Sequence, residues 1–466
     1  MRKKLITLVA LFAIVPAFSQ VKEDDVQYNQ YGQKVTSTVL STELQDGILV
    51  MQSKEAHYKM WFDIRVQGDA AVYFGQDENL VKIGNGMNIR RSRFAVKAML
   101  DEHWYGEFDT DFTSGKAELK DAILAYKGKN FEIKAGNFKE NFSLQRNTSS
   151  RYLQFMERPM VTSLAPSRHL GVAVTYSLPF IWMSGGVFGP ELKGSEEMTY
   201  MEDGNKDIGL NEGLSYTAKV VARPLYKMQN ASLHIGGAFS YREPKLTSTD
   251  GYNVARYSAR NSTSINRKKF LDTDAIKGVD HEIAYTFELS GHYKQLRYEA
   301  AYIARSAILD PAKTIIKDKN DIKPQTADGW YVQAGWLLFG GHQNYDEGGA
   351  KYTRVTPGKS WGDVELCARY ETADYNCSKY YAGGSAQAFA LGLNFYPMKN
   401  VKFAINWQYN MNDKFANGKG STDGVDKGKW NTGYDEAGNP SKIPSQIKGN
   451  GGINYHMIAC RFQVAF

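Results

Sequence analysis

The sequence predicts an all-β fold, a transmembrane antiparallel β-barrel of about 16 strands with short periplasmic turns and long outer loops. Three observations predict it. Apolar and polar residues alternate with a period of two over stretches of roughly ten residues, the length of a strand that crosses a bilayer. The connections between these stretches are short and long in turn. Finally, the chain holds 29 Tyr, 23 Phe and 8 Trp despite a mean hydropathy of −0.47, as expected when only one face of each strand meets lipid.

The start of the chain has the pattern of an export signal. Basic residues at positions 2–4 precede an apolar run, and residues 17–19 have the small-x-small form of a cleavage site. We therefore expect a signal peptide over residues 1–19, cleaved near Gln20, and a periplasmic N-terminal extension over residues 20–58. Without the signal the formal net charge of +7 falls to about +4, which is too mild to predict nucleic-acid binding.

Period-two alternation is clearest in residues 401–410, VKFAINWQYN. Phe403 and Ile405 fall on one face, and Asn406 and Gln408 fall on the other. A barrel domain is therefore expected over residues 59–466. Its alternating stretches cover residues 59–75, 87–100, 103–112, 118–128, 130–138, 169–178, 180–189, 212–224, 229–241, 281–290, 292–305, 328–340, 360–373, 386–397, 400–411 and 453–466.

The connections alternate in length. Short turns are expected at residues 101–102, 128–129, 178–179, 291 and 397–400, and long polar loops at 139–168, 190–211, 242–280, 306–327 and 412–452. Short turns on one rim and long loops on the other are typical of outer-membrane barrels. Residues 341–359 form a long connection where a short one is due. They either fold into the lumen or mark a missed pair of strands.

The chain ends inside an alternating strand, in which Ile458, Phe462 and Phe466 share one face. A closed barrel has no edges, so this strand should pair with the first one. A last strand that ends in Phe also resembles the recognition signal of outer-membrane barrels. This resemblance implies insertion by the barrel assembly machinery.

The residues on the other face of each strand line the lumen, and several of them are basic. Arg65 on the first strand and Arg91, Arg93 and Lys97 on the second are expected to point inward, with Arg90 outward near the rim. Guanidinium donors match the geometry of phosphate and carboxylate groups, so these residues suit an anion path.

Acidic residues on the next strand offer an alternative. Glu107, Asp109 and Asp111 also turn inward and should lie roughly opposite the three cations of the preceding strand. Salt bridges across the two strands would then neutralise the lumen arginines, at least in part.

Two long loops carry further basic residues. The loop at 139–168 is expected to fold into the barrel, because it has no period and carries apolar side chains that an exposed loop would not need. It holds Lys139, Arg146, Arg151, Arg158 and Arg168 against Glu140 and Glu157, and the loop at 242–280 holds Arg256, Arg260, Arg267, Lys268 and Lys269. Either loop could instead form a surface that faces lipopolysaccharide.

Four runs of sequence resemble the phosphate-selective porin O and P family. They are RRSRFAVKAMLDEHWYGEFDTDFTSGKAELKDAILAYKG, FEIKAGNFKENFSLQRNTSSRYLQFMERPMVTSLAPSRHLGV, GWYVQAGWLLFG and ALGLNFYPMKNVKFAINW. The resemblance spans about residues 60–466. It implies a sixteen-stranded porin, usually trimeric, with an anion path lined by basic side chains.

Basic positions of the family's motif blocks correspond to Arg91, Arg93, Arg158 and Arg168 of this sequence. The family also has a lysine cluster in a constricting loop. This sequence does not reproduce that cluster clearly, and its nearest counterparts are Lys268 and Lys269.

Together these observations predict an outer-membrane porin of a Gram-negative bacterium, a passive channel that prefers small anions such as phosphate. The alternative is a general small-solute porin whose lumen arginines are neutralised by Glu107, Asp109 and Asp111. No catalytic residue, cofactor or metal is expected, since the 8 His form no H-x-x-x-H pair. The expected partners are outer-membrane lipid, lipopolysaccharide, the assembly machinery and two further copies in a homotrimer, with no nucleic acid.

Overall fold

The computed structural model describes most of the chain. The described residues are 27–35, 38–45, 47–76, 83–192, 213–244, 246–247, 251–378, 380–413, 415–416, 430–434, 440–444 and 453–466. The expected signal peptide at 1–19 lies outside these residues.

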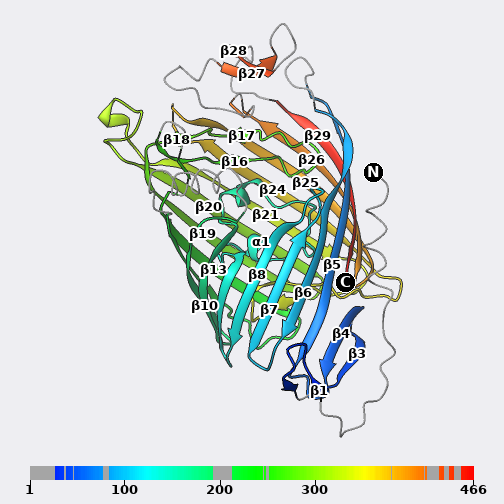
Figure 1. The fold of residues 1–466 in the computed structure, drawn as a ribbon. Coiled ribbons are helices and arrows are strands. Elements are labelled where there is room, and N and C mark those ends of the chain that lie inside the picture. Colours follow the sequence, from blue (N-terminus) through cyan, green and yellow to red (C-terminus); the bar gives the residue numbers. More distant parts are fainter. Residues whose placement is uncertain are drawn as a thin grey trace, which may run out of the picture.

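Sixteen antiparallel strands form a closed barrel (Figure 1). They are β5 (Lys59–Phe74), β6 (Gly86–Met99), β7 (Trp104–Asp111), β8 (Glu118–Lys127), β9 (Phe131–Lys139), β10 (Arg168–Ser177), β11 (Ile181–Phe188), β12 (Ser215–Ala222), β13 (Ala231–Arg242), β19 (Val279–Tyr293), β20 (Leu296–Leu309), β21 (Gln325–Leu337), β24 (Asp363–Asn376), β25 (Ala382–Met398), β26 (Val401–Asn412) and β29 (Tyr455–Ala465). Each strand pairs with the next, and β29 pairs with β5 to close the sheet. The predicted fold class is confirmed.

Short elements precede the first barrel strand or occupy the segments between barrel strands. They are β1 (Gln27–Tyr28), β2 (Lys34–Val35), β3 (Leu40–Gln45), β4 (Ile48–Ser53), α1 (Leu144–Asn147), η2 (Met160–Leu164), β14 (Leu246–Thr247), β15 (Asn253–Ala255), β16 (Ser258–Ala259), β17 (Leu271–Asp272), β18 (Ile276–Lys277), η3 (Lys319–Asp321), β22 (Tyr345–Asp346), β23 (Lys351–Tyr352), β27 (Trp430–Tyr434) and β28 (Pro440–Pro444). Within the described ranges, no helix has the length and apolar character needed to cross a membrane.

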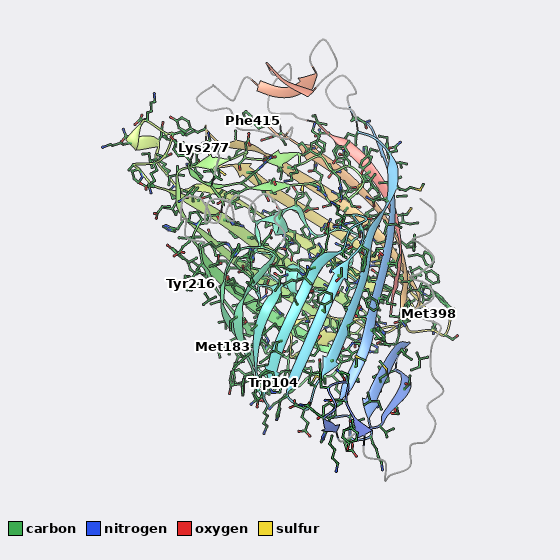
Figure 2. The ribbon with its side chains drawn as sticks, in the orientation of Figure 1. Trp104, Met183, Tyr216, Lys277, Met398 and Phe415 are labelled. Atoms are coloured by element: carbon green, nitrogen blue, oxygen red, sulfur yellow. The ribbon has the colours of Figure 1, made fainter. Side chains whose placement is uncertain are left out.

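Apolar side chains cover the outside of the barrel. Ile405 is 54 % exposed, whereas Gln408 on the opposite face of the same strand is 2 % exposed. Met183 and Tyr216 lie on the outer surface of β11 and β12 (Figure 2). The inward phase carries mostly polar and small side chains, as the alternation predicts.

The hairpin of β3 and β4 extends the sheet beyond one end of the barrel (Figure 1). The pairing of β29 with β5 stops at Ala465 and Arg65, and β4 then pairs with the first residues of β5, with Val50 opposite Trp61. The hairpin therefore covers the part of β5 that lies past the end of the last strand.

β6 departs from the predicted phase at Arg90. Arg91 pairs with Gln67, but Ile89 pairs with the next residue of β5, so Arg90 is the extra residue of a β-bulge. Ile89 is 48 % exposed, while Arg90 bonds Glu157 inside the barrel. The prediction that Arg90 faces outward is wrong, because the bulge turns two consecutive arginines inward.

The turn between β19 and β20 lies at residues 294–295 rather than at Gly291. Lys294 has a φ of 50° at the turn, and Gly291 pairs with Tyr298 within the strands. Gly291 serves a different purpose, because a Cβ there would lie 2.4 Å from the Tyr298 hydroxyl oxygen.

The long connection at the short-turn end, residues 338–362, both folds inward and forms a pair of short strands. β22 and β23 make a small hairpin. Trp182 Nε1 donates to the Gly348 carbonyl oxygen at 2.9 Å, and the Tyr352 hydroxyl lies 2.9 Å from Ser290 Oγ. Because Trp182 and Ser290 are buried on the inner face of the wall, this connection packs inside the barrel.

Candidate functional site

Residues 140–167 lie against one side of the lumen, where inward polar groups of β19, β20, β24 and β26 hold them. We call this side the anchor wall. Glu288 accepts from Leu144 N (2.7 Å), Glu299 from Gln145 Nε2 (2.8 Å), Glu365 from Gln154 Nε2 (2.9 Å), Glu371 from Met160 N (2.5 Å) and Asn406 from Met156 N (2.9 Å).

Apolar packing fixes the same segment. Phe142 and Val161 are 0 % exposed and belong to a cluster that includes Ala284 and Ile303 of the wall. Each such side chain contributes about 1.5–3 kcal/mol when it leaves water. The segment is therefore bound to the anchor wall, and its remaining face is turned toward β6–β9, which we call the open wall.

A cavity of about 670 Å³ lies between this segment and the open wall, on the long-loop side. We call it the outer vestibule. Its lining holds eleven basic residues against three acidic ones. The basic residues are Arg90, Arg91, Arg93, Lys120, Lys139, Arg146, Arg158, Arg168, Arg260, Arg267 and Lys269, and the acidic residues are Asp111, Glu118 and Glu157.

A second cavity of about 650 Å³, the inner vestibule, lies on the short-turn side. Nine basic and five acidic residues line it. They are Arg65, Arg93, Lys97, Lys127, Lys129, Lys134, Lys139, Arg168 and Lys351, with Glu107, Asp109, Asp121, Glu132 and Asp346. The inner vestibule is therefore less positive than the outer one.

Three residues line both cavities: Arg93, Lys139 and Arg168. All three are basic. These side chains lie at the boundary of the two cavities, so a solute that passed from one vestibule to the other would meet basic groups there. The charges of these three side chains act most strongly on a passing ion, because at physiological salt screening weakens the effect of charges that lie more than about 8 Å away.

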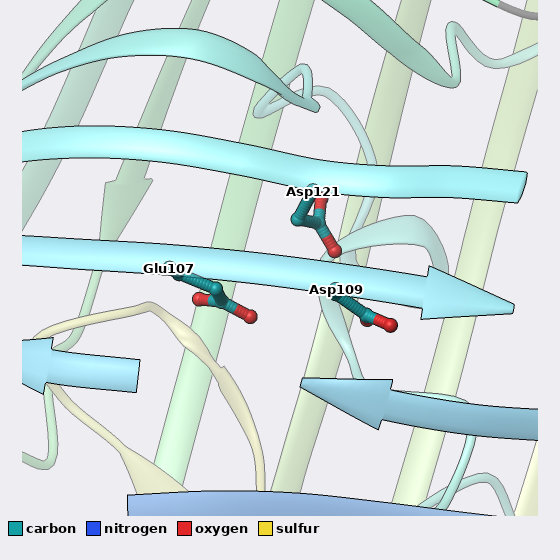
Figure 3. A group of neighbouring side chains, drawn as sticks. All are labelled: Glu107, Asp109 and Asp121. Carbon is teal, nitrogen blue, oxygen red and sulfur yellow. The ribbon is translucent and has the colours of Figure 1, made fainter. Parts of the chain in front are cut away.

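The open wall carries counter-charges for part of this set. Glu107 and Asp109 of β7 and Asp121 of β8 project from neighbouring strands on the same side of the sheet (Figure 3). Asp121 binds Arg168 through both oxygens, at 2.9 and 2.8 Å. Arg93 lies 3.6 Å from Asp109.

The remaining wall pairs differ slightly from the expected register. Lys97 lies 3.3 Å from Glu107, as predicted, but Asp111 binds Arg93 at 2.9 Å rather than Arg91. Arg91 donates instead to Gln67 Oε1 at 2.7 Å. The reason is the regular register of β6 and β7: Lys97 lies opposite Glu107 and Ala95 opposite Asp109, so Arg93 lies opposite Asp111.

The three clustered carboxylates place one oxygen each within 4.8 Å of one another, a spacing that could suit a metal ion. Each of them also pairs with a cation from the same walls. Their chemistry is therefore that of counter-charges, which hold Arg93, Lys97 and Arg168 in place.

Other cations of the path have no carboxylate within salt-bridge distance among the described residues: Arg65, Arg91, Lys139, Arg146, Arg158, Arg260 and Arg267. Arg158 donates to the carbonyl oxygens of Gln145 and Thr148, so it also fixes the loop. Burial, together with the charge of Arg146, lowers the pKa of Arg158 to about 9. The outer vestibule thus keeps a surplus of positive charge.

The candidate residues from the sequence divide between the cavities. Arg91, Arg146, Arg158 and Lys269 line the outer vestibule, Arg65 and Lys97 line the inner one, and Arg93 and Arg168 line both. Two candidates line neither cavity. Arg151 binds Asp63, and Lys268 Nζ lies 5.1 Å from the Phe270 ring centre, where burial lowers its pKa to about 8.

Sequence reasoning missed Arg90 and Lys120. Both are the extra residue of a bulge, since Asp109 pairs with Asp121 while the next residue of β7 pairs with Leu119. Each stands directly beside another charged residue within a strand. Such a pair breaks the period of two, and that break is the signal that could have revealed both bulges.

A family model described as phosphate-selective porin O and P matches residues 62–428. The chain belongs to this family. The resemblance seen in the sequence is thereby confirmed, and family membership places the protein among the channel-forming barrels of the outer membrane.

Individual relatives are more distant. Porin O of Pseudomonas aeruginosa is 24 % identical over 347 residues, which cover 68 % of this chain and 74 % of that protein. OmpT of Vibrio cholerae aligns with a TM-score of 0.47 at 11 % identity, over 87 % of this chain and 98 % of that one. The outer membrane channel DcaP of Acinetobacter baumannii aligns with a TM-score of 0.46 at 12 % identity, over 89 % and 99 %.

Proposed function

We propose that this porin is a passive channel that prefers anions, and that phosphate-like oxyanions are its preferred solutes. The observation that carries the proposal is that the three residues shared by the linings of the two vestibules, Arg93, Lys139 and Arg168, are all basic. Arginine supplies paired donors that fit an oxyanion, and lysine supplies a mobile point charge. The family name supports phosphate as the solute class.

The expected binding is weak enough for conduction. A guanidinium attracts an oxyanion at contact by about 1–4 kcal/mol, between the limits of bulk water and a protein surface. That range favours entry while still allowing release, as transport requires. The salt bridges of Arg93 and Arg168 reduce the field further and keep the side chains extended.

A general small-solute porin is the second candidate, and the same salt bridges favour it. Lys97, Arg93 and Arg168 all have carboxylate partners on the open wall. In that reading the cations only shape the wall. It does not account for Arg146, Arg260 and Arg267 in the outer vestibule, which have no carboxylate within salt-bridge distance among the described residues.

An enzymatic role finds little support. A G-x-S-x-G pattern occurs at residues 358–362, but the nucleophile elbow of hydrolases lies between a strand and a helix. Here the pattern lies in a turn that leads directly into β24.

The test is the reversal potential of the purified protein in a planar bilayer under a salt gradient. The wild type should prefer anions. Arg146→Glu combined with Arg260→Glu should shift the preference toward cations, because both residues line the outer vestibule and, within the described part of the chain, neither forms a salt bridge. Arg158 is less suitable, since it also bonds the loop backbone.

Lys313→Glu is the matched control. Its side chain is 70 % exposed, and it lines neither vestibule. It should leave the reversal potential unchanged. If the wild type shows no anion preference, the anion-channel proposal fails and the general small-solute porin takes its place.

The remaining expectations complete the proposal. We propose that residues 1–19 are removed on export, that residues 20–58 lie in the periplasm, and that the barrel assembly machinery inserts the chain. We also propose a homotrimer embedded in outer-membrane lipid and lipopolysaccharide. Size determination in detergent, with mass analysis of the mature N-terminus, tests the trimer and the cleavage.

A further inference from the structure

Two loops contribute cations to the outer vestibule, and one pair of wall residues touches both loops. Arg369 and Glu371 project inward from β24, are 2 % and 1 % exposed, and pair at 3.1 Å. Arg158 belongs to the segment 140–167, and Arg260 belongs to the loop between β13 and β19.

The contacts to the first loop bracket Arg158 in the sequence. Arg369 Nη1 donates to the carbonyl oxygen of Glu157 at 2.9 Å, and Glu371 accepts from the backbone N–H of Met160. The backbone immediately before and two residues after Arg158 is therefore tied to β24. Arg369 also lies 4.4 Å from the centre of the Phe155 ring, which adds a cation–π contact.

The contacts to the second loop converge on Ser262. Its hydroxyl oxygen lies 3.1 Å from Glu371 Oε1, 3.3 Å from Arg369 Nη2 and 3.4 Å from the carbonyl oxygen of Arg158. Ser262 has a φ of 52°, a left-handed conformation that a non-glycine residue rarely adopts. Such a conformation persists where surrounding contacts hold it.

We infer that Arg369, Glu371 and Ser262 form a clasp that positions Arg158 and Arg260 in the outer vestibule and thereby sets the strength of the anion preference. These three are positioning residues, which act through the two arginines. The inference rests on the proposed function. It goes beyond that function by assigning control of the selectivity to a site where the two loops meet.

Glu371→Gln gives the sharpest test, because two explanations predict opposite signs. If Glu371 is only a counter-charge, its loss adds one positive charge to the lumen, and the anion preference should rise. If it positions the loops, the preference should fall, since the amide cannot serve Met160, Ser262 and Arg369 together.

Glu299→Gln is the matched control for this change. It removes the same charge from the same wall, and Glu299 also binds the first loop, through Gln145. Its hydrogen bonds and ion pair go to Gln145, Tyr331, Gln333 and Arg297, and none of these residues belongs to the second loop. The anion preference should stay the same or rise slightly.

Ser262→Ala and Ser262→Gly cover the case in which Glu371→Gln fails to assemble. Both remove the hydroxyl, and the glycine also removes the backbone strain, so a role of the hydroxyl predicts the same effect for both. Loss of one hydrogen bond should raise the fraction of channels in which the loop is displaced by about two- to tenfold.

Open-channel current noise supplies a readout that does not depend on ion preference. The clasp predicts larger fluctuations in Glu371→Gln and both Ser262 variants, and unchanged noise in Glu299→Gln. If the wild type lacks anion preference but the current noise rises in the clasp variants as expected, the proposed function fails and the loop clasp stands. Unchanged noise and preference in the clasp variants, or a rise in preference, would overturn the clasp.

Discussion

The open wall and the anchor wall are built from the same alternating strands, yet their inward charges act differently. On the open wall, Lys97, Glu107 and Asp121 border a cavity and are partly exposed. On the anchor wall, Glu288 and Glu299 are 0 % exposed at their side chains and bind the inserted segment. An inward charge therefore meets solute or protein according to where the loop lies, and the strand pattern alone does not distinguish the two.

The largest expected effect is on stability, and it is tested by removing one carboxylate from each wall. Glu288→Ala removes the partner of Lys219, His234 and the Leu144 N–H, all of them buried. It should lower the free energy of unfolding by about 3–5 kcal/mol, the cost of leaving a buried charge without its partner. Glu107→Ala on the open wall should cost about 1 kcal/mol or less, because water can replace the carboxylate.

Urea unfolding in lipid or detergent micelles, followed by the change in gel mobility of the folded barrel, measures both variants. Equal losses would mean that the two walls do not differ in this respect.

The next effect concerns accessibility to a water-soluble thiol reagent. In a variant without Cys367, Cys377 and Cys460, a cysteine at Lys134 should react quickly, since that side chain is 26 % exposed in the inner vestibule. A cysteine at Asn406, which is 4 % exposed beneath the inserted segment, should react about a hundredfold more slowly.

Mass spectrometry over a time course gives both rates. Similar rates would show that the segment leaves the anchor wall in the membrane, which would remove the basis of the comparison.

A smaller effect concerns selectivity. Asp121→Asn removes the bidentate partner of Arg168 at the boundary of the two vestibules. The freed guanidinium should raise the anion preference by up to about fivefold, equivalent to roughly 1 kcal/mol at this distance and exposure. The reversal potential measures this change. A shift toward cations would mean that Asp121 mainly holds Arg168 in position.

The smallest effect is a dependence on pH. Burial lowers the pKa of Lys268 to about 8, so its charge is present at pH 7 and lost as the pH rises to 9. Because Lys268 lies next to two residues that line the outer vestibule, the anion preference should fall slightly over this interval. Lys268→Met should reduce the dependence and leave the part that comes from Arg158, whose pKa is about 9; an identical pH profile in that variant would exclude Lys268 as a contributor.

Local patterns predicted the barrel well. In residues 401–410 the alternation gave the correct face for Phe403 and Gln408, and the terminal strand pairs with the first as expected. Position 291 misled, because glycine there makes room for a tyrosine on the neighbouring strand rather than forming the turn. A glycine has several physical uses, and composition does not distinguish them.

The candidate site was predictable only in part. Arg91, Arg93 and Lys97 follow from strand phase, and Arg146, Arg158 and Arg168 follow from the charge of one loop. Arg90 and Lys120 depend on bulges, whose positions are set by pairing with the neighbouring strand. The pairing of Asp111 with Arg93 rather than Arg91 follows from the unbroken register of β6 and β7, in which Ala95 lies opposite Asp109.

By itself the sequence determined the sixteen alternating strands, the positive loop and the family, because each of these depends on residues that lie close together along the chain. The tertiary structure decided which charges meet. Glu371 reaches Met160 across 211 positions, and Arg461 reaches Asp69 across 392. Such pairs form only when the closed sheet brings its first and last strands together and holds the inserted loop against its wall, and their energies depend on burial that no local pattern contains.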